Sequence, residues 1–488
     1  MYLWHTMTKA DVLSFYRNTA AQREKWNRRN RFYHRLLERY FSFVIPPNKR
    51  VLEVGCGSGD LLNAVQPAYG VGIDFAPEVI DIAIRKYSQP ATQTAKPSTK
   101  LNPKLFFRVD DAESLRIDET FDYIILSDML GCLWDAQAAI HNIRRLCHRQ
   151  TKIVISQYNF AWEPLIKFLE WMGLKQRQPN QNWFSVQDVK GLLRLEDFQT
   201  IKVDRKILLP VYFPVLNFLF NTVMANLPLF NQLNLVSIIT ACPLSDEHAD
   251  TSVSIVIPAR NEHWNIENAV RRTPAFGSHR EFIFIEGHSS DGTYEEMERV
   301  QAAYPEKDIK LMRQNDKGKG NAVREAFDAA TGEILMILDA DLTMPPEELP
   351  KFYDALRLGK GDLINGCRLV YPMDRNAMRF LNLLGNRFFG WFFSYLLGQR
   401  LKDTLCGTKV LYRADYLSMK ANRKYFGDFD PFGDFDLLFC AAKLNLKITE
   451  VIIRYRDSEY GATQIRRFRH GWLLLRMCLF AARKIKFM

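Results

Sequence analysis

Residues 51–65 read VLEVGCGSGDLLNAV, an apolar run followed by three glycines at alternate positions and a helix-forming stretch. The apolar run predicts a buried strand, and the residues after the glycines predict a helix. Gly55, Gly57 and Gly59 let the chain turn sharply and let a ligand approach the backbone without meeting a Cβ. Fifteen residues after Gly59, Asp74 ends the next predicted strand, where its carboxylate can accept both hydroxyls of a ribose. The stretch therefore predicts a nucleotide-type cofactor at one edge of a sheet.

Strands alternate with helices on both sides of this loop. A helix is expected over 10–42, and the alternation runs from Val51 to Ser156 and starts again from Val253 to Leu338. Such alternation is typical of a parallel, doubly wound sheet, so two starts predict two α/β domains. We expect a helical cap at 1–48, a first α/β domain at 49–245, a linker at 246–252, a second α/β domain at 253–470 and a basic amphipathic tail at 471–488.

Composition and charge limit the kinds of partner. The eight cysteines form no CxxC pair, which favours a reducing compartment, and Met1–Leu13 lacks the apolar run of a signal peptide, so we expect a cytoplasmic protein. The net charge is +11, and from Arg454 to the end nine Lys or Arg oppose two acids. No nucleic-acid motif accompanies this charge, so we expect no nucleic-acid partner and favour an anionic membrane surface or a phosphorylated substrate. A solvated charged face is the alternative.

The segment Ile207–Ser245 has no charged residue and is long enough for a membrane span of about 20 residues. Pro210, Pro214 and Pro228 interrupt it, and five asparagines lie inside it. We favour a helical lid on the first domain followed by a buried strand. A helix that dips into the membrane is the alternative.

Further motifs extend the first loop into a family pattern. Asp110-Asp111-Ala112-Glu113 follows the third strand, and Phe121–Asp128 (FDYIILSD) forms the fourth. Over roughly residues 10–243 the sequence resembles the class I methyltransferases, which use S-adenosylmethionine (SAM) and have a Rossmann-like sheet. The resemblance implies that the glycine loop faces the methionine part of SAM and that other positions hold the rest: Asp74 the ribose, Asp111 the adenine, Glu53 the loop itself, and Ser127 with Asp128 the sulfonium.

Methyl transfer depends mainly on positioning, because the sulfonium is already a good leaving group. The residues indicate no catalytic base and do not identify the acceptor. The aromatic and basic stretch Trp26–Tyr40 and the lid at Val211–Phe230 favour an organic, partly apolar acceptor, either small or lipid-linked.

The second domain carries Asp339-Ala-Asp341 directly after the apolar run Ile334–Leu338. Two carboxylates beyond a strand end can hold Mg²⁺ or Mn²⁺ against a diphosphate. Three further motifs surround them: Ser254–Glu262 (SIVIPARNE), Ser289–Thr293 (SSDGT) and Lys317–Ala322 (KGKGNA). This order is similar to the family 2 glycosyltransferases of the GT-A fold, over roughly residues 251–470.

The resemblance implies a nucleotide-sugar donor and assigns its contacts. Pro258, Arg260 and Glu262 would line the nucleotide pocket, Asp291 would close it, Lys319 would approach the diphosphate, Asp339 would hold ribose and metal, and Asp341 would hold the metal. Glu286 stands where relatives carry a base-contacting aspartate. Gly287 and His288 depart from the family pattern, which leaves the base preference open.

Later motifs resemble the polyprenyl-phosphate branch of this family, which includes the dolichol-phosphate sugar transferases. They are Asp403–Lys409 (DTLCGTK), Asp428–Asp436 (DFDPFGDFD) and Arg454–Gln464 (RYRDSEYGATQ). In that reading Asp434 or Asp436 is the in-line carboxylate of an inverting transfer. The remaining cations would hold the lipid phosphate, which needs charge rather than deprotonation: Arg454, Arg456, Arg466, Arg467 and Arg469.

Phe380–Leu397 and Trp472–Phe480 are apolar, aromatic and bordered by arginine. Helices lying in the lipid interface suit them, with core helices as the alternative. We therefore expect a bifunctional enzyme at the inner face of the membrane. It would transfer methyl from SAM and, with a metal, sugar from a nucleotide donor to polyprenyl phosphate. The alternative is a glycan or other non-polyprenyl acceptor in cell-envelope polysaccharide or glycolipid assembly, with methylation as a tailoring step.

Overall fold

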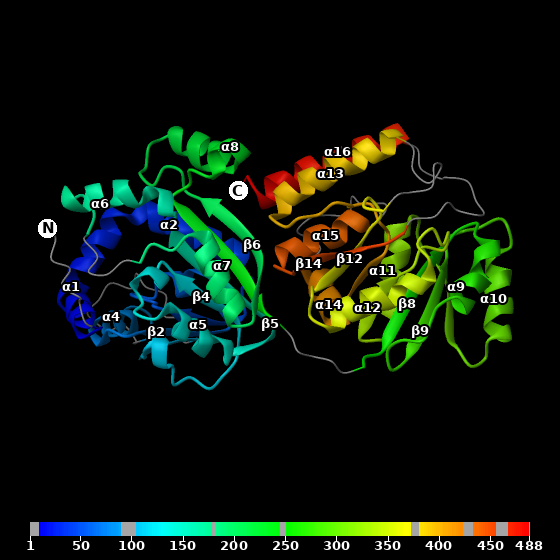
Figure 1. The fold of residues 1–488 in the computed structure, drawn as a ribbon, viewed down its shortest axis with the longest axis horizontal. Coiled ribbons are helices and arrows are strands. Elements are labelled where there is room, and N and C mark those ends of the chain that lie inside the picture. The colour runs from blue at the N-terminus through cyan, green and yellow to red at the C-terminus, as the bar shows by residue number, and fades with distance from the viewer. Residues whose placement is uncertain are drawn as a thin grey trace, which may run out of the picture. The chain divides into compact units, whose positions relative to one another are not determined.

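The computed structural model describes residues 9–88, 104–176, 182–244, 250–371, 380–422, 433–454 and 467–487. The chain forms two compact units, Met1–Leu244 (unit 1) and Ser245–Met488 (unit 2). Each unit is built on one seven-stranded sheet (Figure 1). The predicted fold class, two successive α/β domains, is confirmed.

The sheet of unit 1 has the order β3-β2-β1-β4-β5-β7-β6. Its strands are β1 (Arg50–Val54), β2 (Tyr69–Asp74), β3 (Leu105–Val109), β4 (Phe121–Ser127), β5 (Cys147–Tyr158), β6 (Phe198–Lys206) and β7 (Val236–Pro243). The first five run parallel, but β7 is antiparallel to both β5 and β6. The prediction of a wholly parallel sheet was therefore wrong at this edge. β7 is the predicted buried strand that follows the lid, and all its residues are buried.

Helices cover both faces of this sheet, as in a doubly wound fold. They are α1 (Lys9–Arg29), α2 (Arg31–Val44), α3 (Asp60–Ala64), α4 (Pro77–Tyr87), α5 (Ala136–Arg144), α6 (Glu163–Trp171), α7 (Val186–Leu195) and α8 (Pro228–Asn231). One core cluster joins the sheet to α5 and α7, and a second joins the other face to α2 and α3. In Figure 1, α5 and α7 lie together against the strands of unit 1.

The N-terminal helix is broken, where the sequence predicted one helix over 10–42. α1 ends at Arg29 and α2 begins at Arg31, with Asn30 between them. Leu37, Phe41 and Val44 recur at helical spacing on the buried face of α2, so packing on the sheet sets the direction of this helix. α1 is held differently: its Leu13 and Tyr16 pack against Ala76 and Val79.

The sheet of unit 2 has the order β10-β9-β8-β11-β13-β12-β14. Its strands are β8 (Val253–Ala259), β9 (Arg280–Glu286), β10 (Asp308–Arg313), β11 (Ile334–Ile337), β12 (Leu363–Cys367), β13 (Lys409–Tyr412) and β14 (Ile448–Ile452). β13 is antiparallel to β11 and β12, so this sheet too is mixed. β8 runs parallel to both β9 and β11, so the carboxyl ends of these three strands lie at one edge of the sheet. The predicted site residues follow these strand ends.

The helices of unit 2 are α9 (Ile266–Arg271), α10 (Thr293–Ala303), α11 (Lys319–Ala329), α12 (Leu349–Arg357), α13 (Phe380–Leu397), α14 (Arg413–Asn422), α15 (Asp434–Lys443) and α16 (Arg467–Ile485). α13 and α16 lie side by side (Figure 1). Phe393 of α13 and Leu474, Cys478 and Ala481 of α16 belong to the core of unit 2. The predicted C-terminal tail is thus an amphipathic helix with one face in the core.

A helix that crosses a membrane must be both long and apolar. No helix among the described residues is both long and apolar enough to cross a bilayer. Before β7, the uncharged segment forms three short helical elements: a π-helix at Phe218–Val223, a 3-10 turn at Met224–Asn226 and then α8.

Candidate functional sites

The glycine loop of unit 1 needs its glycines for two physical reasons. Gly55, Gly57 and Gly59 all have positive φ, at 74°, 53° and 77°, where side chains are strained. A Cβ on Gly59 would also lie 2.6 Å from the ring of Phe107. The backbone therefore turns tightly after β1, and Gly55 and Gly57 line a cavity without a side chain in the way.

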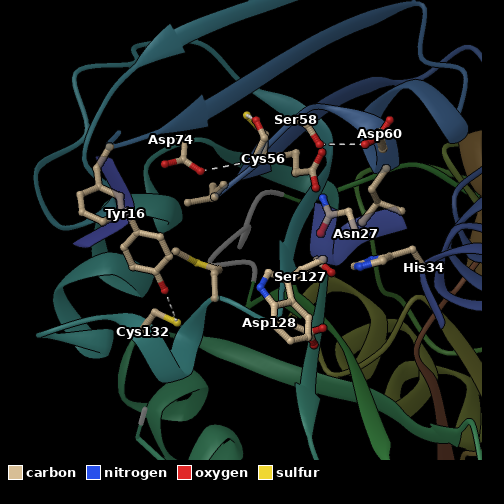
Figure 2. Close-up of a pocket in the computed structure, with 18 of the residues that line it drawn as sticks. Tyr16, Asn27, His34, Cys56, Ser58, Asp60, Asp74, Ser127, Asp128 and Cys132 are labelled. Carbon is tan, nitrogen blue, oxygen red and sulfur yellow. Dashed lines mark hydrogen bonds between the residues drawn. The ribbon is translucent and has the colours of Figure 1, made fainter. Parts of the chain in front are cut away.

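Asp74, at the end of β2, fixes this loop. Its two carboxylate oxygens accept backbone N–H groups of Gly57 and Ala76, each at 3.1 Å. The residue is buried, and Figure 2 shows its carboxylate beside the glycine loop. Glu53 is buried in the wall of the same cavity. The carboxylate predicted to hold a ribose thus also orders the loop that precedes it.

A cavity of about 750 Å³ lies over this loop within unit 1. Its floor comes from the ends of β1, β2 and β4 and from the residues after β3. Its other wall comes from α1 and α2 and includes Tyr16, Trp26, Asn27, Arg31, Tyr33 and His34. In Figure 2, Asn27 and His34 point across the cavity toward Ser127. The predicted residues Glu53, Gly55, Gly57, Asp74, Asp111 and Ser127 all line this one space. Gly59, also predicted, lies just outside it as the N-cap of α3.

Asp111, predicted to contact adenine, forms an ion pair with Lys9, which was not predicted from the sequence. Lys9 Nζ lies 2.5 Å from Asp111 Oδ2 and 2.8 Å from Glu113 Oε2. Burial lowers the pKa of Lys9, but the hydrogen bonds and charges of the two carboxylates outweigh it and raise this pKa. The only signal in the sequence was a cation in an N-terminal helix, which does not indicate its distant partners.

The end of β4 carries a second network. Asp128 has a positive φ of 51°, and its carboxylate accepts the Tyr33 hydroxyl at 2.7 Å and the Ser156 hydroxyl at 2.9 Å. Burial, followed by the charge of Asp128, raises the pKa of Tyr33 well above its usual value. Ser127 Oγ lies 3.2 Å from Ser156 Oγ. These contacts fix two polar side chains at the point where the sequence predicted the sulfonium.

In unit 2, carboxylates gather at the edge formed by β8 and β11. Burial raises the pKa of Glu262 to about 7, and the charges of Asp341, Asp291 and Asp339 add to this effect. Burial and the neighbouring Asp339 likewise raise the pKa of Asp341. Asp341 accepts the backbone N–H and the hydroxyl of Thr343 at 3.2 and 2.9 Å. Negative charge is therefore concentrated there at an energetic cost.

Lys319 and Gly407 shape this edge. Lys319 Nζ, at the start of α11, lies 2.5 Å from Asp339 Oδ1. Gly407 approaches both groups so closely that a Cβ there would overlap the Asp339 carboxylate and the Lys319 ammonium. The sequence placed Gly407 inside a motif but gave no sign of this contact. Gly407 does not have a positive φ, so the lack of space for a Cβ, and not backbone strain, explains the glycine here.

The other predicted donor contacts surround this edge. Asp291 Oδ1 accepts the Thr293 backbone N–H at 3.1 Å. Burial raises the pKa of Asp291, but hydrogen bonds from Thr293 and His263 outweigh burial and lower this pKa below its usual value. Glu286 ends β9 and accepts the backbone N–H of Ser289. Pro258 lies in β8 and Arg260 follows that strand. These positions come together because their strands are parallel neighbours in the sheet.

The donor set suits a hard divalent cation. Among the described residues, no complete set of three His, Cys, Asp or Glu ligands is present. Asp339 and Asp341 offer only carboxylate oxygens, which Mg²⁺ and Mn²⁺ prefer, and both cations commonly take further ligands from phosphate and water. Burial and the charge of Asp339 raise the pKa of Asp341, so a cation between the two carboxylates would offset their repulsion. The two carboxylates therefore fit a metal site whose remaining ligands come from a diphosphate.

The predicted acceptor residues are only partly described. Asp436 on α15 lines a small cavity of about 60 Å³ together with Lys319. α15 reaches this place because Gly433, its N-cap at φ 76°, packs on Gly320, where a Cβ would lie 2.7 Å from the Gly320 Cα. Arg454 is exposed, with its guanidinium 5.6 Å from the centre of the Tyr371 ring. The remaining predictions lie outside the described residues or side chains: Asp434, Arg456, Arg466, Arg467 and Arg469.

The loop at Asp403–Lys409 is fixed by a buried ion pair that the sequence did not indicate. The Arg368 guanidinium contacts both Asp403 carboxylate oxygens, at 2.7 and 2.9 Å. Burial raises the pKa of Asp403, but Arg368 outweighs it and holds this pKa below its usual value. Because Gly407 lies in the same loop, Arg368 positions the backbone that packs on Asp339.

Comparison with known proteins gives two family matches. The profile of glycosyl transferase family 2 matches residues 254–418, and a methyltransferase-domain profile matches residues 25–203. The chain is 35% identical over 120 residues to a dolichol-phosphate mannosyltransferase of Pyrococcus furiosus, a match that covers 24% of this chain and 33% of that protein. It thus spans about a third of the length of that relative.

Two further likenesses complete the comparison. Glycosyltransferase AglJ of Haloferax volcanii is 30% identical over 227 residues, which covers 46% of this chain and 69% of AglJ. A solved Haloferax volcanii methyltransferase, in complex with the Trm112 methyltransferase activator, is 16% identical with a TM-score of 0.36; the match covers 49% of this chain and 99% of that one.

Proposed function

We propose that this chain, which belongs to the family 2 glycosyltransferases and carries a SAM-dependent methyltransferase domain before its glycosyltransferase domain, performs two transfers at two separate sites. One transfer moves a methyl group from SAM to an organic acceptor. The other moves a sugar from a nucleotide donor to a polyprenyl phosphate. The observation that carries the proposal is that each unit gathers its predicted binding residues around one edge of one sheet.

For methyl transfer, the chain's work is mainly positioning. The amides of the glycine loop and the Asp74 carboxylate would hold the methionine and ribose parts of SAM, and Asp111 the adenine. Asp128, held by Tyr33 and Ser156, would lie beside the sulfonium. In-line attack then breaks the bond between sulfur and the methyl carbon as the acceptor bond forms.

For sugar transfer, Lys319 and the edge of carboxylates would bind the donor diphosphate. Asp339 and Asp341 would hold Mg²⁺ or Mn²⁺, which when bound supplies positive charge to the leaving group. The Lys319 ammonium pairs with Asp339 in this structure, and it would also attract the diphosphate of a bound donor. A phosphate oxygen of the acceptor would attack the anomeric carbon as the bond from that carbon to the donor diphosphate breaks, so the configuration there would invert. Asp434 or Asp436 would be the carboxylate beside this line of attack.

Two observations support a polyprenyl phosphate as the sugar acceptor. The Pyrococcus furiosus relative is a dolichol-phosphate mannosyltransferase. In addition, α13 exposes Leu384, Phe388 and Trp391 at helical spacing, and α16 exposes Leu479 and Phe480 beside it. An aromatic, apolar helix pair of this kind suits the lipid interface, where the phosphate of such an acceptor lies. Arg454 would attract that phosphate.

The test compares acceptors that differ in one feature. Purified full-length protein is incubated with labelled nucleotide sugars and with a long-chain polyprenyl phosphate in vesicles, the matching polyprenol, or a soluble oligosaccharide. We expect transfer only to the phosphate. Equal transfer to the polyprenol would contradict the proposal, and transfer to the oligosaccharide alone would favour the glycan alternative.

A pair of surface variants tests the docking helices. Trp391→Glu should lower transfer to the vesicle-bound acceptor about tenfold, because burying a charge at the interface offsets the apolar contact. Leu417→Glu on α14, also at an exposed apolar position, is the matched control and should change nothing. Both variants should transfer equally well to a short, water-soluble isoprenyl phosphate. A loss with that substrate would show damage to the active site instead.

A further inference from the structure

The uncharged segment of unit 1 is folded with its polar groups inward. Asn221 accepts the backbone N–H groups of Leu208 and Leu209 at 2.9 Å, and Asn234 donates to the carbonyls of Arg205 and Ala225 at 3.0 and 2.8 Å. The other asparagines bond to nearby groups in the same way: Asn217, Asn226 and Asn231. The amides thus replace helix hydrogen bonds and hold short turns together.

Most large apolar side chains between Val211 and Leu233 are exposed. Val215 is 84% exposed and Leu229 is 80% exposed. Eight more large apolar side chains of the segment are exposed: Val211, Tyr212, Phe213, Leu216, Phe218, Leu219, Leu227 and Leu233. This is the reverse of a water-facing loop, in which asparagines are exposed and leucines are buried.

The helix α6 extends this apolar surface. Trp171 is 81% exposed, and Phe160, Leu165, Phe168, Met172 and Leu174 are exposed around it. The Trp162 indole donates to the Leu233 carbonyl at 2.8 Å, which ties α6 to the uncharged segment. We call Phe160–Leu174 and Val211–Leu233 together the lid surface; α6 and α8 lie on one side of unit 1 (Figure 1). It holds sixteen of the thirty exposed large apolar residues in the described chain.

A strongly basic stretch borders the lid surface. Between positions 25 and 39 there are six Lys or Arg and one acid, Glu38, and all six cations are exposed: Lys25, Arg28, Arg29, Arg31, Arg35 and Arg39. No ion pair involves any of them among the described residues. The rings of Phe32 and Tyr212 meet at 5.4 Å, which joins this stretch to the lid surface. An apolar, aromatic area flanked by exposed cations matches the apolar acyl chains and the anionic head groups of a lipid bilayer.

The SAM cavity is lined by residues from the same two neighbourhoods. Arg28, Arg31 and Arg35 from the basic stretch line it, and so do Lys175 and Gln176, which follow the lid surface at Leu174. A molecule held at the basic stretch therefore lies next to the cavity.

We propose that the lid surface rests on an anionic lipid bilayer and that the SAM cavity beside it takes its methyl acceptor from the membrane, as the head group of an amphiphile. The inference rests on the proposed methyltransferase activity and gives its acceptor a class. Each Lys or Arg near an anionic leaflet contributes about 1 kcal/mol, and the exposed aromatic side chains add apolar burial. No helix has to span the bilayer for this contact.

Fluorescence locates the contact on the full-length protein. The probe is a vesicle of 70% phosphatidylcholine and 30% phosphatidylglycerol with brominated acyl chains, which quench nearby indoles. We expect quenching that decreases in Trp171→Phe and is unchanged in the control Trp264→Phe, whose indole is exposed in unit 2. Equal quenching in wild type and Trp171→Phe would overturn the docking proposal, whatever α13 contributes.

A second arm tests the source of the acceptor. Trp171→Glu/Leu229→Glu is compared with Leu195→Glu/Leu417→Glu, a pair that adds the same charge at exposed positions outside the lid surface. Methyl label from SAM should enter the organic extract of natural-lipid vesicles about tenfold more slowly in the first variant only, with unchanged SAM affinity by calorimetry. Unchanged labelling would overturn the acceptor proposal. A change from dimer to monomer in sedimentation would assign the surface to a second copy. Failure of the wild type to bind SAM would instead refute the methyltransferase proposal.

Discussion

The two candidate sites treat negative charge in opposite ways. In unit 1, the Asp74 carboxylate accepts two backbone amides and Asp111 is paired with Lys9. In unit 2, Glu262 and Asp341 lie among further carboxylates, and the pKa of each is raised. In the first site these carboxylates already have partners within the chain, whereas those of the second would be stabilised by an added cation. The contrast agrees with the metal and diphosphate proposed for unit 2.

The same contrast separates the requirements of the two reactions. In the proposed function, binding in unit 1 would depend on backbone geometry, because the loop that would hold SAM has positive φ at its three glycines. Binding in unit 2 would depend on side-chain charge, because the proposed ligands of donor and metal are carboxylates and Lys319. A steric change should therefore break the first site, and a charge change should break the second.

The largest expected effect is in the glycine loop. Gly57→Arg places a long side chain at φ 53°, where the Gly57 amide bonds to Asp74, so we expect SAM affinity to fall more than a hundredfold. Sugar-nucleotide affinity should stay within about twofold, because unit 2 has its own sheet and core. Titration calorimetry with each ligand measures both. Gly191→Arg is the matched control, because a Cβ on this exposed helical glycine meets nothing within 4 Å. Loss of both ligands in a folded Gly57→Arg protein would refute two independent sites.

The next effect tests the charge side of the comparison. Asp341→Asn keeps a side chain that can accept the Thr343 bonds but removes one negative charge from the metal clamp. We expect sugar transfer to fall at least about a hundredfold, as for removal of one preorganised electrostatic contact, while methyl transfer continues. EDTA should have the same selective effect on the wild type.

The control for this variant is Asp354→Asn, which removes an exposed carboxylate on α12 of the same unit. It should leave both activities unchanged. Full sugar transfer by Asp341→Asn in EDTA would contradict the metal assignment and would remove the difference drawn between the two sites.

Much of the fold could be predicted because strand and helix signals are local. Phe380–Leu397 forms a helix at the predicted bounds, and the strand in the run Ile334–Leu338 ends one residue earlier, since each is an apolar run with clear ends. The antiparallel direction of β7 and β13 could not be predicted, because strand direction depends on where the chain returns to the sheet. The break at Asn30 was missed because Asn30 accepts the next turn of helix through its carbonyl, which keeps the helical pattern nearly continuous.

The sites were predictable where a motif is contiguous in sequence. Asp339, Asp341 and the glycine loop are read from single runs of residues. Lys9 and Arg368 were missed because their partners lie 102 and 35 positions away, and a lone cation in a helix or loop carries no local signal. The inward asparagines of the lid were counted in the sequence, yet only the structure gives the direction in which they point.

The smallest expected effect sharpens the comparison through pH. The pKa of Glu262 is raised to about 7 in the folded protein, from about 4.5 in the unfolded chain, so its protonated form favours the fold. That stability is fully present below pH 4.5 and is lost as the pH rises through 7. Solvent screens this half-buried group, so we expect a loss of only about 1 kcal/mol. Thermal unfolding of unit 2, followed as a function of pH, should show this loss of stability.

Mg²⁺ should reduce the loss, and Glu262→Gln should abolish it. Glu333→Gln, at an exposed position of the same unit, should keep the wild-type slope. A flat wild-type profile, or a slope that Glu262→Gln leaves unchanged, would mean that unit 2 pays no such electrostatic cost. The contrast between the two sites would then rest on Asp341 alone, whose pKa is raised by burial and by the charge of Asp339.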